Sequence, residues 1–104
     1  MALGEFELLV LLAVSRLDDA YAVSVREEIE ARTGRPVPRG SVYITLDRLT
    51  RKGYLRERSA GGGAERAGVA KRVFATTADG KAAAKEAIDG LRRMQQGLAW
   101  LTRP

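Results

Sequence analysis

Hydrophobic residues recur at helical spacing in four stretches of the chain, and the first of them is apolar on nearly every side. It begins at Leu3, contains the apolar run Leu8–Val14 and ends near Leu17. A helix of this kind buries more than one side, so we expect it to pack against its own domain and against something else. The run is far below the roughly 20 apolar residues that a bilayer requires, so no membrane partner is expected.

A second stripe of apolar residues predicts a helix that begins after Asp18 and Asp19, which we interpret as its caps. The stripe consists of Tyr21, Ala22, Val25 and Ile29. Thr33 and Gly34 are expected to end this helix, because Gly tolerates a left-handed backbone. The segment Pro36–Pro38 then predicts an extended connection, and a third helix begins between residues 38 and 41.

The third helix separates into two faces. At about 100° per residue, one face is apolar and can pack on a core; it consists of Val42, Leu46 and Leu49. Polar side chains gather roughly 100° away from it: Ser41, Thr45, Arg48 and Lys52. We therefore expect the polar face to point outward, as in a helix that lies in the DNA major groove, where Arg meets guanine and Ser or Thr meets base edges or phosphate.

Two short strands and a fourth helix are predicted after the third helix. The strands are Leu55–Arg58 and Arg72–Thr76, joined by a glycine-rich loop that contains Gly61–Gly63. Thr77 is the expected cap of a last helix that continues towards Trp100. Apolar residues of this helix alternate between spacings of three and four, which predicts a seam for a partner helix: Ala84, Ala87, Leu91, Met94, Leu98 and Leu101.

The order of elements predicts a mainly α fold of the α+β class, a winged helix-turn-helix with a long C-terminal dimerisation helix. In this arrangement the third helix reads DNA and the hairpin, called the wing, touches the flanking backbone. We expect a DNA-binding domain over residues 1–76, with the wing at about 55–76, and a dimerisation helix over residues 77–104.

Basic residues are concentrated in the middle of the chain. Residues 35–72 hold ten Lys and Arg against three Asp and Glu, a net charge of +7, whereas residues 1–34 carry −4 and residues 73–104 carry +2. A local basic block favours a polyanionic partner such as double-stranded DNA, although an Arg-rich soluble surface gives the same count.

The chain contains no Cys and no His. This excludes disulfides and thiolate chemistry, and it removes the usual zinc ligands and the commonest general base. We therefore expect no metal, no cofactor and no enzymatic activity, and we interpret the chain as a cytoplasmic protein.

Five segments resemble the PadR family of bacterial transcriptional regulators: LGEFELLVLLAV, AYAVSVREEIEARTG, GSVYITLDRLTRKGYL, KRVF and TTADGK. The similarity covers residues 3 to about 81, and Gly40–Tyr43 belongs to its most specific part. Ile44 departs from the family, which often has Pro or a small residue at that position. The single helix that follows resembles the short-tailed branch, whose members are homodimers held together by their first and last helices.

We predict DNA contacts from nine residues of the third helix and the wing: Arg39, Ser41, Tyr43, Thr45, Arg48, Arg51, Lys52, Lys71 and Arg72. Only one of Lys71 and Arg72 needs to face DNA, because strand alternation turns the other away while Phe74 packs inward. Tyr43 is open to two interpretations. The resemblance implies a phosphate contact through its hydroxyl, and packing on the second helix is the alternative.

The predicted dimer interface draws on the first and last helices: Leu8, Leu12, Leu91, Met94, Leu98 and Leu101. The alternative is that the last helix packs on the first within one chain. Trp100 either packs for stability or, as the resemblance implies, lines an apolar channel between subunits that admits a small planar apolar effector.

These observations predict a sequence-specific DNA-binding transcriptional regulator, a repressor rather than an activator, that binds a pseudo-palindromic operator as a homodimer. The alternative is a winged-helix module for protein interaction that lacks specific DNA binding.

Overall fold

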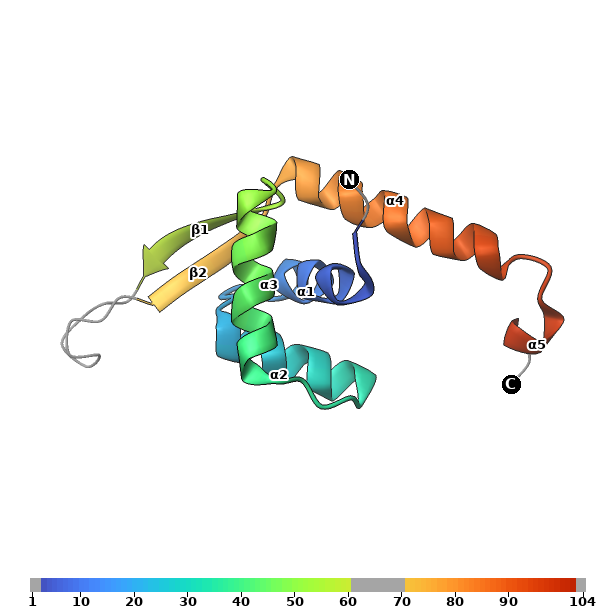
Figure 1. Ribbon diagram of the computed structural model, residues 1–104, viewed down its shortest axis with the longest axis horizontal. Helices are drawn as coiled ribbons and strands as arrows, with labels where there is room; N and C mark the ends of the chain where they lie inside the picture. Colours follow the sequence, from blue (N-terminus) through green and yellow to red (C-terminus); the bar gives the residue numbers. More distant parts are fainter. Residues whose placement is uncertain (1–2, 61–70, 103–104) are drawn as a thin grey trace.

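The computed structural model describes residues 3–60 and 71–102, and it has the predicted order of three helices, a hairpin and a terminal helix (Figure 1). The glycine-rich loop expected between the strands lies outside these residues. The elements are α1 (Glu5–Arg16), α2 (Ala22–Thr33), α3 (Arg39–Arg51), β1 (Leu55–Ala60), β2 (Lys71–Thr76), α4 (Ala78–Gln95) and α5 (Ala99–Thr102). The winged helix-turn-helix fold is therefore confirmed.

The core lies where α1, α2 and α3 meet and where the hairpin closes over one end. Leu11 of α1, Val25 of α2 and Leu46 and Leu49 of α3 are fully buried, and Phe74 of the wing joins the same cluster. The apolar stripes predicted for these three helices thus face one another. Shortening one such Leu to Ala typically costs about 2 to 5 kcal/mol, so these contacts set how firmly α3 is held.

The wing is an antiparallel pair in which Leu55 lies opposite Thr76. A further backbone bond extends it, because the Phe74 N–H donates to the Ala20 carbonyl at 2.8 Å. Ala20 is therefore extended and α2 starts only at Ala22, with the Tyr21 N–H donating to Ser24 Oγ at 3.0 Å. The predicted caps, Asp18 and Asp19, are wrong for this reason.

The connection between α2 and α3 is fastened to α2. Arg26 Nε donates to the Val37 carbonyl at 2.6 Å, and the Val37 N–H donates to Glu30 Oε2 at 2.9 Å. Val37 itself is buried in the core. Gly34 ends α2 in the left-handed conformation, with φ 74°, as predicted. These contacts fix where α3 begins.

The beginning of α4 is fixed to the turn between α3 and β1. Thr77 Oγ1 accepts a bond from the Gly80 N–H at 3.0 Å, which confirms the predicted cap, and it donates to the Gly53 carbonyl at 2.7 Å. Gly80 lies so close to this turn that a Cβ atom on it would stand 2.2 Å from the Tyr54 carbonyl oxygen. Any larger residue at position 80 would push α4 away from the domain.

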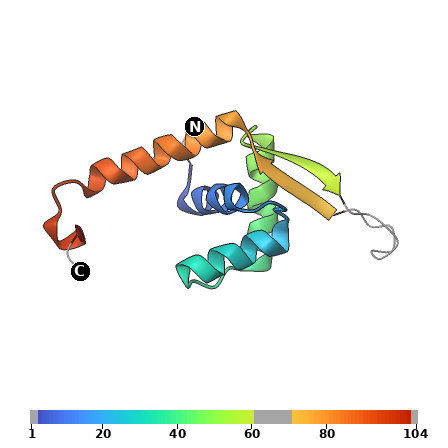
Figure 2. The ribbon, with the colours of Figure 1, turned by 180° about the vertical axis from the view of Figure 1, so that it is seen from behind.

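Beyond this anchor α4 crosses α1 and then extends away from the three-helix unit (Figures 1 and 2). It ends at Gln95, Gly97 adopts φ 85°, and a single turn, α5, follows. The prediction of one continuous helix to Trp100 is therefore wrong, because the left-handed Gly97 breaks it and places Leu98 and Leu101 on a separate turn. The division of the chain after residue 76 stays a prediction.

Candidate nucleic-acid interface

The exposed face of α3 is centred on Ile44. Gly40, Tyr43, Arg48 and Arg51 surround it and are exposed as well, and Arg39 is exposed at the first position of the helix. At about 100° per residue, the middle of this face is displaced by roughly 70° from the middle of the polar face that the sequence predicts. The helix is therefore rotated about its axis relative to our expectation, and Ile44, which was not among the predicted contacts, lies at the centre of the exposed surface.

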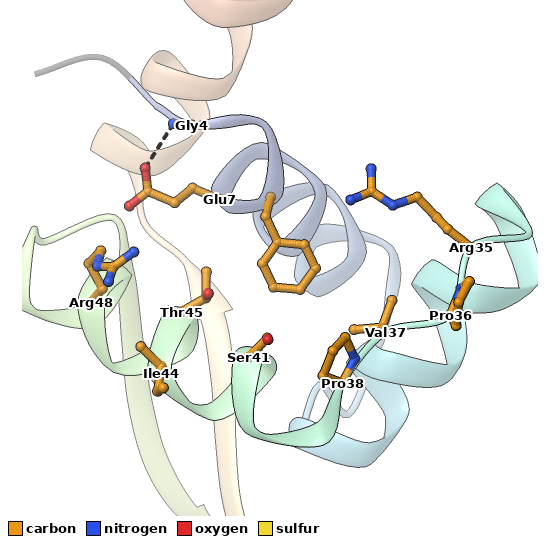
Figure 3. Close-up of a pocket in the computed structure, with 11 residues that line it drawn as sticks. Gly4, Glu7, Arg35, Pro36, Val37, Pro38, Ser41, Ile44, Thr45 and Arg48 are labelled. Carbon is orange, nitrogen blue, oxygen red and sulfur yellow. Dashed lines mark hydrogen bonds between the residues drawn. The ribbon is translucent and has the colours of Figure 1, made fainter.

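Thr45 is the residue most affected by this rotation. Its exposed fraction is only 4%, so the prediction that it faces outward is wrong. The physical reason is that the start of α1 lies over this side of α3, and Figure 3 shows Ser41, Thr45 and Arg48 on the side of α3 that faces Glu7. The space between them is a cavity of about 480 Å³. Ser41 is half-buried at its edge, and Arg48 remains exposed.

Lys52 is also drawn into the fold. Its Nζ donates to Glu7 Oε2 at 2.7 Å, and both side chains are largely buried. Burial alone raises the pKa of the Glu7 carboxyl, but bonds from Lys52 and the Gly4 N–H, with the charges of Lys52 and Arg48, outweigh it and lower that pKa. Lys52 thus neutralises a carboxylate of α1, and its predicted place on an outward face is wrong.

The wing, α2 and α3 enclose a small cleft of about 230 Å³. It brings together three of the predicted contacts, Tyr43, Lys71 and Arg72, and adds the first turn of α2 at Ala22 and Val23. The N–H groups of a first turn have no partner inside their own helix and attract anions. Sequence reasoning missed this turn, because Ala22 and Val23 are apolar and its position depends on the bond between Ala20 and the wing, which joins distant segments.

The two wing cations occupy different positions. Lys71 Nζ lies 3.9 Å from the centre of the Tyr21 ring, at the edge of the cleft. Arg72 is bound by carboxylates: its Nη2 donates to Asp47 Oδ1 at 2.6 Å and to Glu57 Oε1 at 2.9 Å. Phe74 is buried, as the predicted alternation requires. Of the two cations, Lys71 is the one without a carboxylate partner in the described part of the chain.

Electrostatically, the charge of α3 is carried by three arginines. Arg39, Arg48 and Arg51 are exposed, and none of them forms an ion pair with any residue in 3–60 or 71–102. An exposed cation without a carboxylate partner is available to a phosphate or a base edge. Whether these residues contact DNA stays a prediction, but their exposure is compatible with it.

The residues predicted for the dimer interface divide into two groups. Leu8 packs in the core of its own chain and also lines the groove between α1 and α4, and Leu12 is partly buried. The other group lies on α4 and α5 and is exposed: Leu91, Met94, Leu98 and Leu101. Trp100 is exposed too, with 71% of its surface accessible. Its role in a ligand channel stays a prediction.

Within residues 3–60 and 71–102, no group of three or more acidic side chains lies close enough to hold a metal ion. None of the helices in that part of the chain has the length and apolar character that a membrane crossing requires.

Comparisons with known proteins agree with the geometry. The family model "Transcriptional regulator PadR-like family" matches residues 10–86. Comparison with curated proteins gave no match.

Solved structures of low sequence identity share the fold. A PadR family transcriptional regulator from Eggerthella lenta is 22% identical with a TM-score of 0.75, and the match covers 94% of this chain and 81% of that one. A PadR family regulator from Clostridium difficile is 15% identical with a TM-score of 0.78, covering 96% and 100%. A PadR-like transcription factor from Bacteroides fragilis is 17% identical with a TM-score of 0.78, covering 95% and 91%. With its family model matched over most of its length, the chain belongs to the PadR-like family of transcriptional regulators.

Proposed function

We propose that this regulator binds double-stranded DNA in a sequence-specific manner, with α3 in the major groove and the wing beside the flanking backbone. The observation that carries the proposal is the exposed face of α3, where Arg39, Arg48 and Arg51 have no carboxylate partner in the described residues. The charge of +7 over residues 35–72 supports it, because counterion release on phosphate neutralisation drives such binding.

The rotation of α3 changes the contacts that we propose. Arg48 is the candidate for guanine, and Ile44 now has the position and the apolar surface to meet a thymine methyl group. Arg39 and Arg51 are candidates for phosphate. Thr45 and Lys52 are not among the proposed contacts, because Thr45 is buried and Lys52 is paired with Glu7 inside the fold.

A second group of contacts lies at the cleft between α2 and the wing. We propose that a DNA phosphate binds there, met by the Tyr43 hydroxyl, the Lys71 ammonium and the first-turn N–H groups of α2. The cleft lies beside α3, so a phosphate there would flank the groove that α3 enters. Such contacts orient the protein and add affinity without choosing the sequence.

We propose further that the chain acts as a homodimer. Leu91, Met94 and Trp100 are exposed on the part of the chain that extends beyond the three-helix unit (Figure 1). A groove of about 680 Å³ lies between the start of α1 and α4, and Leu3, Leu91 and Met94 line it. Burying this apolar surface against a second copy removes it from water.

Two α3 helices related by a twofold axis would meet half-sites about one helical turn, roughly 34 Å, apart on a pseudo-palindromic operator. We propose that the homodimer acts as a repressor when it occupies such an operator. We also propose that it works in the cytoplasm, because bacterial DNA is found there. An apolar planar effector near Trp100 is the candidate signal, since this ring is exposed in the single chain.

Selection of bound sequences from random duplex DNA tests the proposal. The expected result is enrichment of a pseudo-palindrome with half-sites one turn apart. The alternative, a winged-helix module for protein interaction, predicts no enriched sequence and no shift of random duplex even at low salt, where non-specific binding by basic surfaces is strongest.

A further inference from the structure

Arg72 connects the wing to α3 through two carboxylates. Its Nε donates to Glu57 Oε2 and its Nη2 to Glu57 Oε1, both at 2.9 Å, while Nη2 also donates to Asp47 Oδ1 at 2.6 Å. Glu57 belongs to β1 and Asp47 to α3. We call these three residues the Arg72 clasp. A planar guanidinium suits this role because its donors point in fixed directions and can meet two carboxylates together.

We propose that Arg72 is a positioning residue: it fixes the angle between the wing and α3, and through that angle the sequence preference of the DNA interface, instead of contacting phosphate itself. The inference rests on the proposed DNA-binding function. It replaces the sequence-based expectation that Arg72 is a phosphate contact.

The charge balance of the clasp supports this assignment. One guanidinium faces two carboxylates, so the group carries a net charge of −1 and offers no attraction to phosphate. The hydrogen bond from Arg72 lowers the pKa of Glu57, although burial and the charge of Asp47 act to raise it. The two carboxylates in turn raise the pKa of Arg72. Glu57 and Arg72 are therefore both charged at neutral pH.

The clasp is placed where the hairpin needs support. Where β1 ends and β2 begins, the hairpin points away from the helices (Figure 1). The buried Phe74 and the bond from its N–H to the Ala20 carbonyl hold the wing at the level of Glu57. Beyond that level, the described contacts to the helices besides the clasp are the Lys71–Tyr21 ring contact and a long, exposed ion pair, Arg58–Asp19, at 3.9 Å. A pair at that distance contributes little. Loss of Arg72 would therefore loosen the part of the wing beyond Phe74, while the buried Phe74 keeps the rest attached to the core.

The clasp also restrains Asp47, the only acidic residue of α3. Asp47 is half-exposed beside the face that we propose for DNA. A free carboxylate there would repel phosphate. Arg72 therefore has two effects through other groups: it holds the wing, and it neutralises a carboxylate next to the interface.

Replacing Arg72 by Lys separates positioning from phosphate contact. Lys keeps the positive charge and loses the fork that bridges two carboxylates. The measured quantity is the ratio of the affinity for the selected operator to the affinity for random duplex. We expect R72K and R72A each to lower this ratio by about tenfold, because coupled residues typically contribute effects of this size. D47N should lower it to a similar extent. The proposal would be overturned if R72K kept the wild-type preference while R72A bound DNA weakly. That result would indicate that Arg72 contacts phosphate directly.

Arg56 supplies the matched control, because it lies exposed on β1 and forms no ion pair in the described chain. R56K should keep the wild-type preference.

Hydrogen exchange of the wing amides in the free protein tests the clasp without DNA. Exchange should be faster by about fivefold or more in R72K and D47N, and unchanged in R56K, because local opening follows the loss of tethering contacts. If the wild-type protein fails to bind duplex DNA, the proposed function is wrong. Hydrogen exchange still tests whether the Arg72 clasp holds the wing to α3. Unchanged exchange in R72K overturns the inference even where DNA binding is established.

Discussion

Glu7 of α1 accepts a hydrogen bond from Lys52 at the end of α3, with 2.7 Å between Oε2 and Nζ, across 45 positions of the sequence. Glu7 lines the cavity beside α3, and Arg48 contributes to the field that lowers the Glu7 pKa. Because α3 carries the proposed DNA contacts, the pair that holds α1 against α3 also determines which face of α3 remains free.

E7Q should lower the free energy of unfolding at pH 7 by about 1 to 3 kcal/mol, because it removes a charged acceptor from a largely buried ammonium. Chemical denaturation measures this loss. E5Q is the matched control: Glu5 pairs with Arg35 at the surface, and its replacement should change stability by less than about 0.5 kcal/mol.

The same pair predicts a pH dependence. A folded-state pKa below the unfolded value of about 4.5 stabilises the protein above that pH, and the contribution disappears as the pH falls through the folded pKa. The wild type should therefore lose more stability than E7Q between pH 6 and about pH 3. Some loss will remain in E7Q, since the pKa values of Glu28 and Glu57 are also lowered. Identical pH profiles for the two proteins would contradict the prediction.

Gly80 controls how closely α4 approaches the domain. G80A should lower the free energy of unfolding by about 1 to 3 kcal/mol, because the added Cβ would stand 2.2 Å from the Tyr54 carbonyl, a backbone atom that cannot turn aside. G40A is the control on α3, where an added Cβ meets nothing within 4 Å. It should leave stability unchanged or raise it by up to about 1 kcal/mol. Thermal unfolding of both variants is the measurement.

Most elements of the fold could be predicted from the sequence because local patterns determine them. Val42, Leu46 and Leu49 are buried as the helical spacing indicates, Thr77 caps α4, and Gly34 ends α2. Each of these features depends on residues within a few positions along the chain, so a single sequence contains the necessary information.

Parts of the site could not be predicted because they depend on contacts between distant segments. A helical wheel groups Thr45 with Ser41 and Arg48, but it does not show that α1 crosses over that side. The Glu7–Lys52 pair joins residues 45 positions apart, and the Arg72–Asp47 bond joins residues 25 apart. In the last helix, Gly97 was visible in the sequence, but the heptad spacing on both sides of it wrongly favoured continuity.

The corrected orientation of α3 predicts opposite results for two neighbouring residues. R48A should weaken binding to the selected operator by about 1 to 3 kcal/mol and relax the preference at one base position, since Arg48 is exposed. T45V should leave affinity within about twofold of the wild type, because Thr45 is buried and does not reach the surface. Titration of labelled operator with each variant, at one salt concentration, provides the comparison. A large loss in T45V would restore the orientation that the sequence predicted.

The exposed apolar residues of α4 and α5 give the last prediction. M94E should convert a dimer to a monomer, because Met94 is 77% exposed in the single chain and lines the groove between α1 and α4, and burying a carboxylate in this apolar contact costs free energy. Light scattering after size-exclusion chromatography measures the mass. Q95E introduces the same change in charge one position further along α4, where the side chain does not line the groove, and it should stay dimeric. Since an operator with two half-sites is bound by two linked α3 helices, M94E should also lose most of its operator affinity while keeping its weaker binding to random duplex. A monomeric wild-type protein, or a dimeric M94E, would show that the exposed apolar surface of α4 and α5 does not join two copies.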